Sequence, residues 1–421
     1  MTLDLLVISR ETIKPSSPTA THLRTYKLSN IDQYSPPFSV PIILFYSVGR
    51  DGDTKVSDRL KDSFSETLTL FYPLGGKVVD NDTIDCDDSG VEYWETEIKS
   101  RLDEFLSNPV ADEVDQLLPT YLHCRMSTET QLQIQVSTFE CGGMAIGARI
   151  SHKVADAATL CSFVNTWATK TSGTNKAVTP RFVSAALFPP RQVSQFAPSD
   201  VGLPVQPRLV SKRFVFDSSD ITLLKAKSAV TLHPTRVQVV TALMWKCLMN
   251  ASSKLRYRKS HVLNIAVNLR RRMVPALPEN SFGNLIIGAM LSSERGAELH
   301  SLVELLRKAV RKFDANYVKN LEKNDGVATF HHSLIQSYIQ SAEGELGLHT
   351  ITSWCRFPFY DADFGWGKPI WVSSLNVAHQ NVVILTDTKN GDGIEALVTL
   401  DEEDMAIFEC EEELLSFASP Y

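Results

Sequence analysis

The 421-residue sequence has no basic tract, no long apolar run and no paired cysteine motif. Its net charge is −7, and phosphate recognition requires clustered Lys and Arg, so we expect no nucleic acid partner. No stretch approaches the roughly 20 apolar residues of a membrane-spanning helix. The first ten residues lack the basic start and the longer apolar core of a signal peptide. These absences predict that the chain has no membrane partner.

Cysteine usage and motif absences exclude several further classes. The seven cysteines are scattered, odd in number and without a Cys-x-x-Cys pair, which argues against a disulfide framework or a cysteine-based zinc site. Reduced thiols are typical of a cytoplasmic protein. Gly-x-Gly-x-x-Gly, a Walker loop, Gly-x-Ser-x-Gly and His-Glu-x-x-His are all missing. The pair His331-His332 has no nearby carboxylate, so a helix-surface or core pair is favoured over a metal site. We expect no metal.

What is present indicates a globular chain in two parts. Apolar residues make up 43% and charged residues 22%, enough for sizeable cores. Strand and helix patterns mix in both halves, which predicts a mixed α/β class. The proline-rich stretch over 171–210 predicts an extended connector, because proline repeatedly removes a backbone donor. We therefore expect an N-terminal lobe over 1–178, a linker over 179–210 and a C-terminal lobe over 211–421.

Local patterns predict particular elements. Leu132–Phe139 alternates apolar and polar residues, which indicates a half-buried strand, and Met144–Ile150 indicates a more buried one. Helical spacing follows from Ala158 to about Lys170. In the second half, a hairpin is predicted where Asn390-Gly391 lies between apolar runs. The other candidates there are a helix over 238–248, a strand over 261–267 and an amphipathic helix over 302–313.

His152 lies where the buried strand gives way to the helix, and Asp156 follows four residues later. A histidine held in such a loop can face a cleft, and a neutral imidazole is the usual group for taking a proton from an alcohol. Two structural alternatives remain open. Asp156 could cap the helix that begins at Ala157, and His152 could be a satisfied core histidine.

A second element lies near the end of the chain, where residues 363–367 read Asp-Phe-Gly-Trp-Gly. Together with His-x-x-x-Asp at 152–156, this sequence resembles the plant BAHD acyltransferase family. Further matches are Lys14–Thr19, Tyr72–Lys77, Val267–Arg272 and Phe282–Asn284. Departures occur at Gly75, Lys77 and Ala157, where many members have Ala, Arg and Gly, and none removes a proposed catalytic group. Within the family, the chain is most similar to the branch that contains vinorine synthase, an alkaloid O-acetyltransferase.

The resemblance implies two chloramphenicol-acetyltransferase-like lobes joined by the crossover linker, with a solvent channel between them. It implies an O-acyltransferase, in which an acyl-CoA, most simply acetyl-CoA, is the co-substrate and a small-molecule alcohol of plant specialised metabolism, an alkaloid or terpenoid, is the acceptor. No permanently bound cofactor is expected. The protein would act as a cytoplasmic monomer.

The family's residue roles carry over by position. His152 would be the general base, and Asp156 would give structural support by pairing with Arg270 or Arg272. The indole N–H of Trp354 or the hydroxyl of Thr352 would stabilise the oxyanion, although a core role for Trp354 remains open. The loop at 363–367 would be a rigid structural element through Asp363, Gly365, Trp366 and Gly367, and a pair between Asp363 and an Arg could lock it. The coenzyme A candidates are Lys212, Arg213, Thr235, Asn284 and Asp387; a solvated charge pair is the alternative for Lys212 and Arg213.

Other functions remain open at this point. N-acylation of an amine could use the same base. A non-catalytic relative that binds a small molecule or protein is a different class, which the intact His152 and Trp354 disfavour. A peptide-condensation domain would usually carry a second histidine before the catalytic one, where this chain has Ser151.

Overall fold

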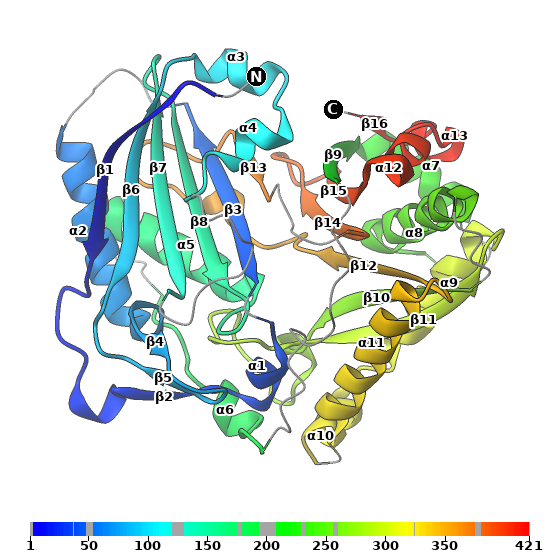
Figure 1. The fold of residues 1–421 in the computed structure, drawn as a ribbon, viewed down its shortest axis with the longest axis horizontal. Helices are drawn as coiled ribbons and strands as arrows, with labels where there is room; N and C mark the ends of the chain where they lie inside the picture. Colours follow the sequence, from blue (N-terminus) through cyan, green and yellow to red (C-terminus); the bar gives the residue numbers. More distant parts are fainter. Residues whose placement is uncertain are drawn as a thin grey trace. The chain divides into compact units, whose positions relative to one another are not determined.

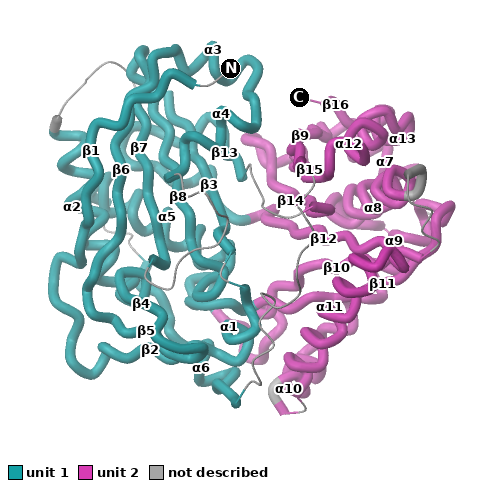
Figure 2. The backbone as a smooth tube through the Cα atoms, viewed as in Figure 1, with its two compact units in different colours: residues 1–193, 278–285, 357–376 teal, residues 194–277, 286–356, 377–421 magenta. Residues whose placement is uncertain are grey.

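The computed structural model describes residues 3–36, 38–47, 54–119, 130–174, 178–192, 208–228, 233–255, 260–323, 325–374 and 380–420. They form two compact units (Figure 2). Unit 1 comprises Met1–Val193, Pro278–Leu285 and Phe357–Asn376; unit 2 comprises Ser194–Leu277, Ile286–Arg356 and Val377–Tyr421. In the described part of the chain, no helix combines the length and apolar character that crossing a membrane requires. The fold is mixed α/β, as predicted.

The division between the units differs from the boundaries predicted from sequence. Residues 278–285 and 357–376, which the sequence boundaries placed in the C-terminal lobe, belong to unit 1. The physical reason for the later segment is strand pairing, because β13 (Trp371–Ser373) pairs antiparallel with β3 (Ser39–Tyr46). Unit 1 is therefore completed by residues far along the chain.

A six-stranded mixed sheet organises unit 1 (Figure 1). Adjacent strands pair antiparallel except β6 and β7, which run parallel. In sheet order, the strands are β1 (Leu5–Ile13), β6 (Val91–Ile98), β7 (Leu132–Phe139), β8 (Met144–Ser151), β3 and β13. A smaller sheet has the order β2 (Thr25–Lys27), β5 (Thr83–Asp85) and β4 (Lys77–Val78).

The helices of unit 1 include two long ones that pack together, α2 (Thr54–Leu70) and α5 (Ala157–Thr171). Their aromatic side chains meet the sheet, since Phe64 lies 5.1 Å from Trp167 and 5.7 Å from Tyr93 between ring centroids. The shorter helices are α1 (Asn30–Tyr34), α3 (Leu102–Ser107), α4 (Ala111–Asp115), α6 (Ser184–Leu187) and the 3₁₀ turns η1 (Thr21–Leu23), η2 (Tyr72–Gly75) and η5 (Phe359–Asp361).

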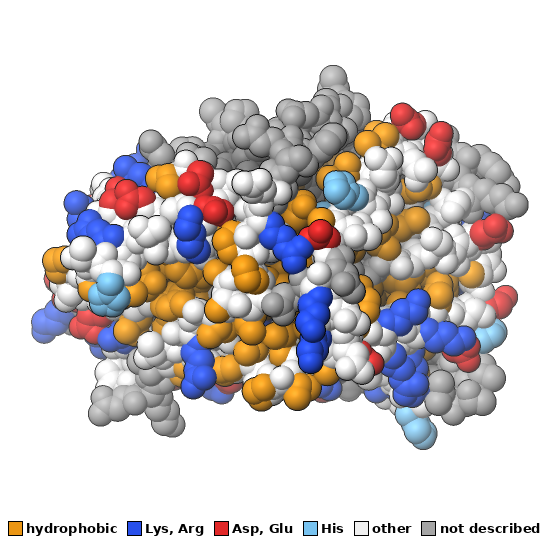
Figure 3. All heavy atoms as spheres, turned by 90° about the horizontal axis from the view of Figure 1, so that it is seen from below, with side chains coloured by type: hydrophobic (Ala, Val, Ile, Leu, Met, Phe, Trp, Pro, Cys, Tyr) orange, Lys and Arg blue, Asp and Glu red, His pale blue; other side chains and the backbone are white. Residues whose placement is uncertain are grey.

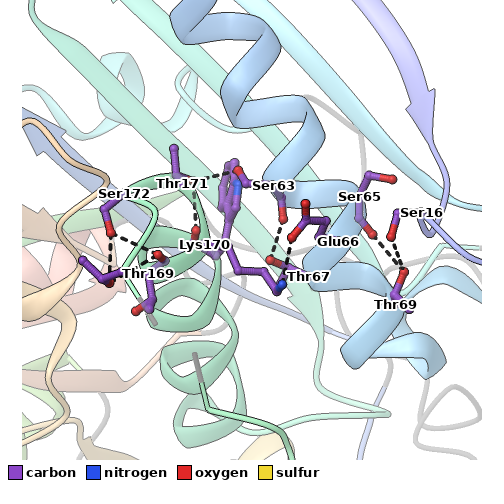
Figure 4. Close-up of polar contacts among 12 residues, drawn as sticks. Ser16, Ser63, Ser65, Glu66, Thr67, Thr69, Thr169, Lys170, Thr171 and Ser172 are labelled. Carbon is purple, nitrogen blue, oxygen red and sulfur yellow. Dashed lines mark hydrogen bonds and ion pairs between the residues drawn. The ribbon is translucent and has the colours of Figure 1, made fainter. Parts of the chain in front are cut away.

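Polar contacts fasten the C-terminal half of α5 to α2 (Figure 4). The hydroxyls of Ser63 and Thr171 lie 2.7 Å apart in a buried position, and the Lys170 ammonium donates to Glu66 at 2.8 Å. The buried Ser63–Thr171 contact in particular restricts how one helix can slide on the other, whereas the Lys170–Glu66 pair is more exposed. The C-terminal end of the helix that follows the His152 loop is thus anchored to α2.

Strand β7 is buried on both faces, which corrects the prediction of a half-buried strand. Gln133, Gln135 and Ser137 are almost fully enclosed although their side chains point away from α2 and α5. The segment after α4 covers this second face, where the Gln135 amide donates to the carbonyl of Gln116 at 2.8 Å. The polar residues that alternate along β7 therefore mark a face that another segment covers, not a face exposed to water.

Unit 2 is built on a seven-stranded mixed sheet. Strands β10 and β12, and β12 and β14, pair parallel, and the other neighbours pair antiparallel. In sheet order, the strands are β11 (Ile286–Glu294), β10 (Ser260–Asn268), β12 (Gly347–Ser353), β14 (Val382–Asp387), β15 (Ile394–Asp401), β9 (Leu209–Phe216) and β16 (Ser419–Pro420). The predicted hairpin is confirmed, since β14 and β15 flank Asn390-Gly391.

Helices pack against this sheet: α8 contacts β12, α9 contacts β11, and α12 contacts β9 and β15. Helix α8 corresponds to the helix predicted over 238–248, and α9 corresponds to the one predicted over 302–313. Strand β10 corresponds to the strand predicted over 261–267. The helical elements of unit 2 are α7 (Ser218–Ser228), α8 (Arg236–Leu255), η4 (Arg270–Arg272), α9 (Leu299–Arg311), α10 (Ala315–Lys323), α11 (Gly326–Ala342), α12 (Glu402–Phe408) and α13 (Glu412–Leu415).

The predicted linker is only partly described, because 193–207 lie outside the described residues. Its described part contains α6 and a bridge between Arg181 and Ser281, so it is not extended throughout. On the face drawn in Figure 3, Lys and Arg side chains occur at several separate places among acidic, polar and apolar ones. This dispersal on that face agrees with the lack of a basic tract in the sequence.

Candidate active site

His152 follows β8 directly, and α5 begins at Ala157, so the histidine lies in the predicted strand-to-helix loop. Backbone hydrogen bonds hold this loop. The His152 N–H donates to the carbonyl of Phe38 at 2.7 Å, and the N–H groups of Val154 and Ala155 both donate to the carbonyl of Ser151, at 3.0 and 3.1 Å. The imidazole therefore projects from a short segment that these backbone hydrogen bonds hold in place, as a precisely placed functional side chain requires.

The imidazole of His152 contacts a residue that is remote in sequence. Its Nδ1 lies 2.9 Å from the side-chain Oδ1 of Asn284, which is fully buried in unit 1. A side-chain carbonyl oxygen can only accept, so Nδ1 carries the proton and donates it. The lone pair of the neutral ring is then on Nε2, the nitrogen that can act as a base.

Asn284 was predicted to be a coenzyme A contact in the C-terminal lobe; it lies in unit 1 instead, and its coenzyme A role stays a prediction. Its amide Nδ2 donates to Asp32 Oδ1 at 2.8 Å and to the backbone carbonyl of His152 at 2.7 Å. Its backbone N–H also donates to Asp32 Oδ1, at 2.8 Å. Since Oδ1 meets His152, each polar group of this side chain is already used beside the histidine.

Neighbouring residues fix the segment that carries Asn284. The Thr159 hydroxyl donates to the Gly283 carbonyl at 3.1 Å and lies 3.2 Å from the Gly283 N–H. Gly283 has φ +106°, and a Cβ there would come within 2.7 Å of the Ser184 hydroxyl oxygen. Only glycine suits this backbone position. The segment is therefore held between α5 and α6.

Asp156 has the role that the capping alternative gave it. Its Oδ1 accepts from the Thr159 N–H at 2.9 Å, so Asp156 is the N-cap of α5. Its Oδ2 accepts from the Leu285 N–H at 3.1 Å. The carboxylate thus joins the helix after His152 to the segment that carries Asn284. Its pairing with Arg270 or Arg272 stays a prediction.

The arginines of η4 are placed as follows. Arg270 is fully buried, and its backbone N–H donates to Asn268 Oδ1 at 3.0 Å. The Nη1 of Arg272 donates to the carbonyls of Val310 and Phe313, at 3.1 and 2.8 Å. Burial lowers the pKa of the Arg272 guanidinium below its usual range.

The two oxyanion candidates lie at the end of β12 in unit 2. Thr352 is half-buried on the strand. Trp354 is buried, and its backbone N–H donates to the carbonyl of Leu385 at 2.7 Å. Both the oxyanion role and the core role of Trp354 remain predictions.

The remaining coenzyme A candidates have partners within unit 2. Lys212 pairs with Glu409, and Arg213 pairs with Glu395 at 3.2 Å. Both cations thus have carboxylate partners, although the Arg213–Glu395 pair is largely buried rather than solvated. A phosphate would have to compete with the carboxylates, so the coenzyme A role of both stays a prediction.

Thr235 and Asp387 are also engaged. Thr235 directly precedes α8, and its Oγ1 accepts from the Gln238 N–H in the first turn at 3.2 Å. Asp387 accepts from the Arg236 guanidinium and from the Arg356 N–H. The coenzyme A role of these residues likewise stays a prediction.

The loop at 363–367 lies in unit 1 and is organised by its own carboxylate. Asp363 Oδ1 accepts from the N–H groups of Gly365 and Gly367 at 2.8 and 2.9 Å. The two glycines have φ values of +102° and +109°, which other residues rarely adopt. The rings of Phe364 and Trp366 stack at 5.6 Å. This geometry supports the predicted structural role, while an Asp363–Arg pair stays a prediction.

Asp32 and Lys153 border the site, and neither was singled out from sequence. Asp32 is fully buried and meets Asn284. The Lys153 ammonium donates to the Gln33 carbonyl at 2.8 Å and to Asn81 Oδ1 at 2.6 Å. Burial lowers the pKa of Lys153 to about 8, against the opposing effect of the Asp32 charge. Ser29-x-x-Asp32 is a recognisable capping-box pattern, but that signal marks a helix start and not a contact with Asn284.

Comparison with known proteins identifies the family. The family model described as Transferase family matches residues 3–415, almost the whole chain. The chain belongs to the BAHD acyltransferase family. Similar relatives include a limonoid 1-O-acetyltransferase of Citrus sinensis, 37% identical over 98% of both chains, and the stemmadenine O-acetyltransferase of Catharanthus roseus, 37% identical over 97% of this chain and 96% of the relative.

The solved structure of vinorine synthase is also similar to this BAHD protein. The TM-score is 0.82 and the identity is 34%, with 99% of each chain covered. The predicted chloramphenicol-acetyltransferase-like class is confirmed by this likeness. The chain is accordingly an acyl-CoA-dependent acyltransferase.

Proposed function

We propose that this BAHD enzyme transfers the acetyl group of acetyl-CoA to a hydroxyl of a plant alkaloid or terpenoid alcohol. Support for the acetyl group and the hydroxyl comes from the relatives, which are named O-acetyltransferases and match over nearly their full length. Their named acceptors, limonoids and stemmadenine, support this acceptor class. N-acylation of an amine and non-catalytic binding are the competing functions.

The contact between His152 Nδ1 and Asn284 Oδ1 carries the proposal. An unassisted alcohol is a poor nucleophile, and a positioned base typically contributes ~10²–10⁴-fold to the rate. The contact leaves Nε2 as the proton acceptor, so the neutral imidazole is prepared for base catalysis. A histidine that served only packing would not need this tautomer.

The reaction proceeds by direct transfer in a ternary complex. Nε2 of His152 takes the hydroxyl proton as the oxygen attacks the thioester carbonyl carbon. The C–S bond then breaks, the ester is released, and the thiolate of coenzyme A takes the proton from the imidazolium. Charge on the carbonyl oxygen during the attack requires a nearby donor, for which Trp354 and Thr352 are the proposed sources.

Binding and assembly complete the proposal. Lys212, Arg213, Thr235 and Asp387 contribute to coenzyme A recognition, with the two cations exchanging their carboxylate partners for phosphate. The enzyme acts as a monomer in the cytoplasm and needs no bound cofactor besides its co-substrate. Size-exclusion chromatography with light scattering tests the monomer, and a dimer mass would contradict it.

The substrate class is tested with isotopically labelled acetyl-CoA and a panel of alkaloid and terpenoid alcohols, each matched to an amine analogue. Thiol release and product mass are measured for each acceptor. Labelled esters from alcohols are expected. Acetylation confined to amines would favour the competing reaction, and thiol release no faster than without protein would contradict catalysis.

A further inference from the structure

The two carboxylate oxygens of Asp32 accept hydrogen bonds from two different residues, Ser29 and Asn284. Its Oδ2 accepts from the N–H and the hydroxyl of Ser29, at 2.8 and 2.7 Å, and so closes the capping box of α1. Its Oδ1 accepts from the backbone N–H and the side-chain Nδ2 of Asn284, both at 2.8 Å. Two separate structures, a helix start and the Asn284 segment, therefore meet at one buried carboxylate.

The Oδ1 side of Asp32 determines how the Asn284 amide is oriented. Nδ2 has two hydrogens, and both are directed at acceptors, Asp32 Oδ1 and the His152 carbonyl. If the amide rotated by half a turn, its oxygen would face these two acceptors without a proton between them. Buried acceptors left in this state are costly. The amide therefore keeps its oxygen toward the imidazole.

The orientation of Asn284 in turn determines the proton on His152. With Oδ1 facing it at 2.9 Å, Nδ1 must donate. With the amide reversed, an N–H would face Nδ1, which would then carry the lone pair and leave the proton on Nε2. In that tautomer the imidazole could not accept a proton from a hydroxyl at Nε2.

We propose that Asp32 is a positioning residue for the transfer reaction, which fixes the base-competent tautomer of His152 by orienting the amide of Asn284. The inference rests on the proposed function, in which His152 Nε2 is the base. Burial raises the pKa of the Asp32 carboxyl, and its hydrogen bonds with Ser29 and Asn284 oppose this effect. Because Oδ1 receives only N–H donors, it acts as an acceptor in either charge state.

The tautomer is measured directly by NMR of the full-length protein with ¹⁵N-labelled histidine. The ring nitrogens of a neutral histidine differ in chemical shift according to which one bears hydrogen, and the His152 signals are assigned by their loss in His152→Gln. The wild type is expected to show Nδ1–H at His152. A predominantly Nε2–H ring in the wild type would overturn the proposal without any variant.

Two substitutions distinguish the contact of Asp32 with Asn284 from its part in the capping box of α1. Asp32→Ala removes the acceptor for Asn284, so Nε2–H should become populated and kcat should fall by roughly 10²-fold. Ser29→Ala is the matched control, because it weakens only the capping box. It should lower the melting temperature while the tautomer and kcat stay as in the wild type. An Asp32→Ala protein that keeps Nδ1–H and full turnover would overturn the proposal.

A double-mutant comparison tests whether Asp32 acts through Asn284. In an Asn284→Ala background the amide is gone, so Asp32→Ala should add less than 3-fold to the loss of kcat. Additive losses would show that Asp32 acts by another route. If Asp32→Ala does not fold, Asn284→Ala alone must still move the His152 proton from Nδ1 toward Nε2. An Asn284→Ala protein in which His152 keeps Nδ1–H would contradict the proposal. Absence of acetyl transfer by the wild type would instead contradict the proposed function.

Discussion

The Nδ1 of His152 lies 2.9 Å from the Oδ1 of Asn284, although 132 residues separate them in the chain. The contact is made inside unit 1, because residues 278–285 belong to it. The base of the proposed reaction is therefore oriented by a segment that is synthesised long after the strand and helix on either side of the base. A fragment that ended at the linker would keep the histidine and lose its orientation.

Asp156→Ala should lower thermal stability and activity together. The carboxylate caps α5 and accepts from the Leu285 N–H, so its loss releases the histidine loop from the Asn284 segment. A lost N-cap typically costs ~1 kcal/mol, and a broken buried pair with Arg270 or Arg272 would raise this to ~3–5 kcal/mol. Thermal melting and steady-state turnover measure the two effects.

The control for Asp156 is another N-cap aspartate. Asp401 caps α12 in unit 2, where its Oδ1 accepts from the Asp404 N–H at 2.8 Å. Asp401→Ala should lower the melting temperature and leave kcat near the wild-type value. An Asp156→Ala protein with wild-type melting and lost turnover would show that Asp156 has a direct catalytic role.

Lys153 should make stability depend on alkaline pH. Its folded-state pKa is lowered by burial to about 8, below the value near 10.4 of a free lysine. Between these values the unfolded chain keeps the proton that the native protein has lost, so the unfolded state binds more protons and the contribution of Lys153 to stability rises with pH. Well below pH 8 both states are protonated, and this contribution is constant.

Urea unfolding at pH 7.5 and pH 9.5 tests this sign. The free energy of unfolding of the wild type, minus that of Lys153→Met, should increase between the two pH values. Taking the difference removes the contribution of the buried thiols, whose pKa values are raised in the native protein while the unfolded-state thiols, with a pKa of about 8.5, titrate between these two pH values. An unchanged or decreasing difference would contradict the assignment.

No stable acetyl-enzyme should form, because the proposed transfer is direct. Burial raises the pKa of the Cys86 and Cys355 thiols to about 12, and it also raises the pKa of Cys161, so these groups are poor nucleophiles at neutral pH. Intact mass after incubation with acetyl-CoA alone should equal that of the untreated protein. A stoichiometric gain of one acetyl group, or loss of turnover with a chelator, would contradict the mechanism.

Asp363→Ala should destabilise the protein without a matching loss of kcat. It removes the acceptor for two backbone N–H groups, those of Gly365 and Gly367, at ~1 kcal/mol each. Asp361→Ala nearby is the control, because its ion pair with Lys368 is largely exposed and such pairs contribute little. A large fall in kcat for a well-folded Asp363→Ala protein would indicate a catalytic contribution.

Local patterns in the sequence predicted the elements around His152 well. Period-two alternation located β7, a short apolar run located β8, and helical spacing located α5, since each signal depends on residues close in the chain. Alternation did not reveal that Gln133 and Gln135 are buried, because it cannot distinguish water from a covering segment such as the one that contains Gln116.

Local sequence patterns could not predict which residues contact His152 and its neighbour Asn284. Asp32 and Asn284 are 252 residues apart, and no periodicity links them. Asn284 stood in a recognisable Phe-Gly-Asn motif, yet its placement in unit 1 depends on how the chain returns from unit 2. Long-range contacts of this kind follow from tertiary packing and not from local propensity.

The central claim, that His152 is the base for acyl transfer, is tested most directly by His152→Ala. Turnover with acetyl-CoA and an accepted alcohol is compared with that of His300→Ala, which removes an exposed histidine on α9. We predict that His152→Ala retains its fold and loses ~10²–10⁴-fold in kcat while His300→Ala remains active. Near-normal turnover by a well-folded His152→Ala protein would contradict it.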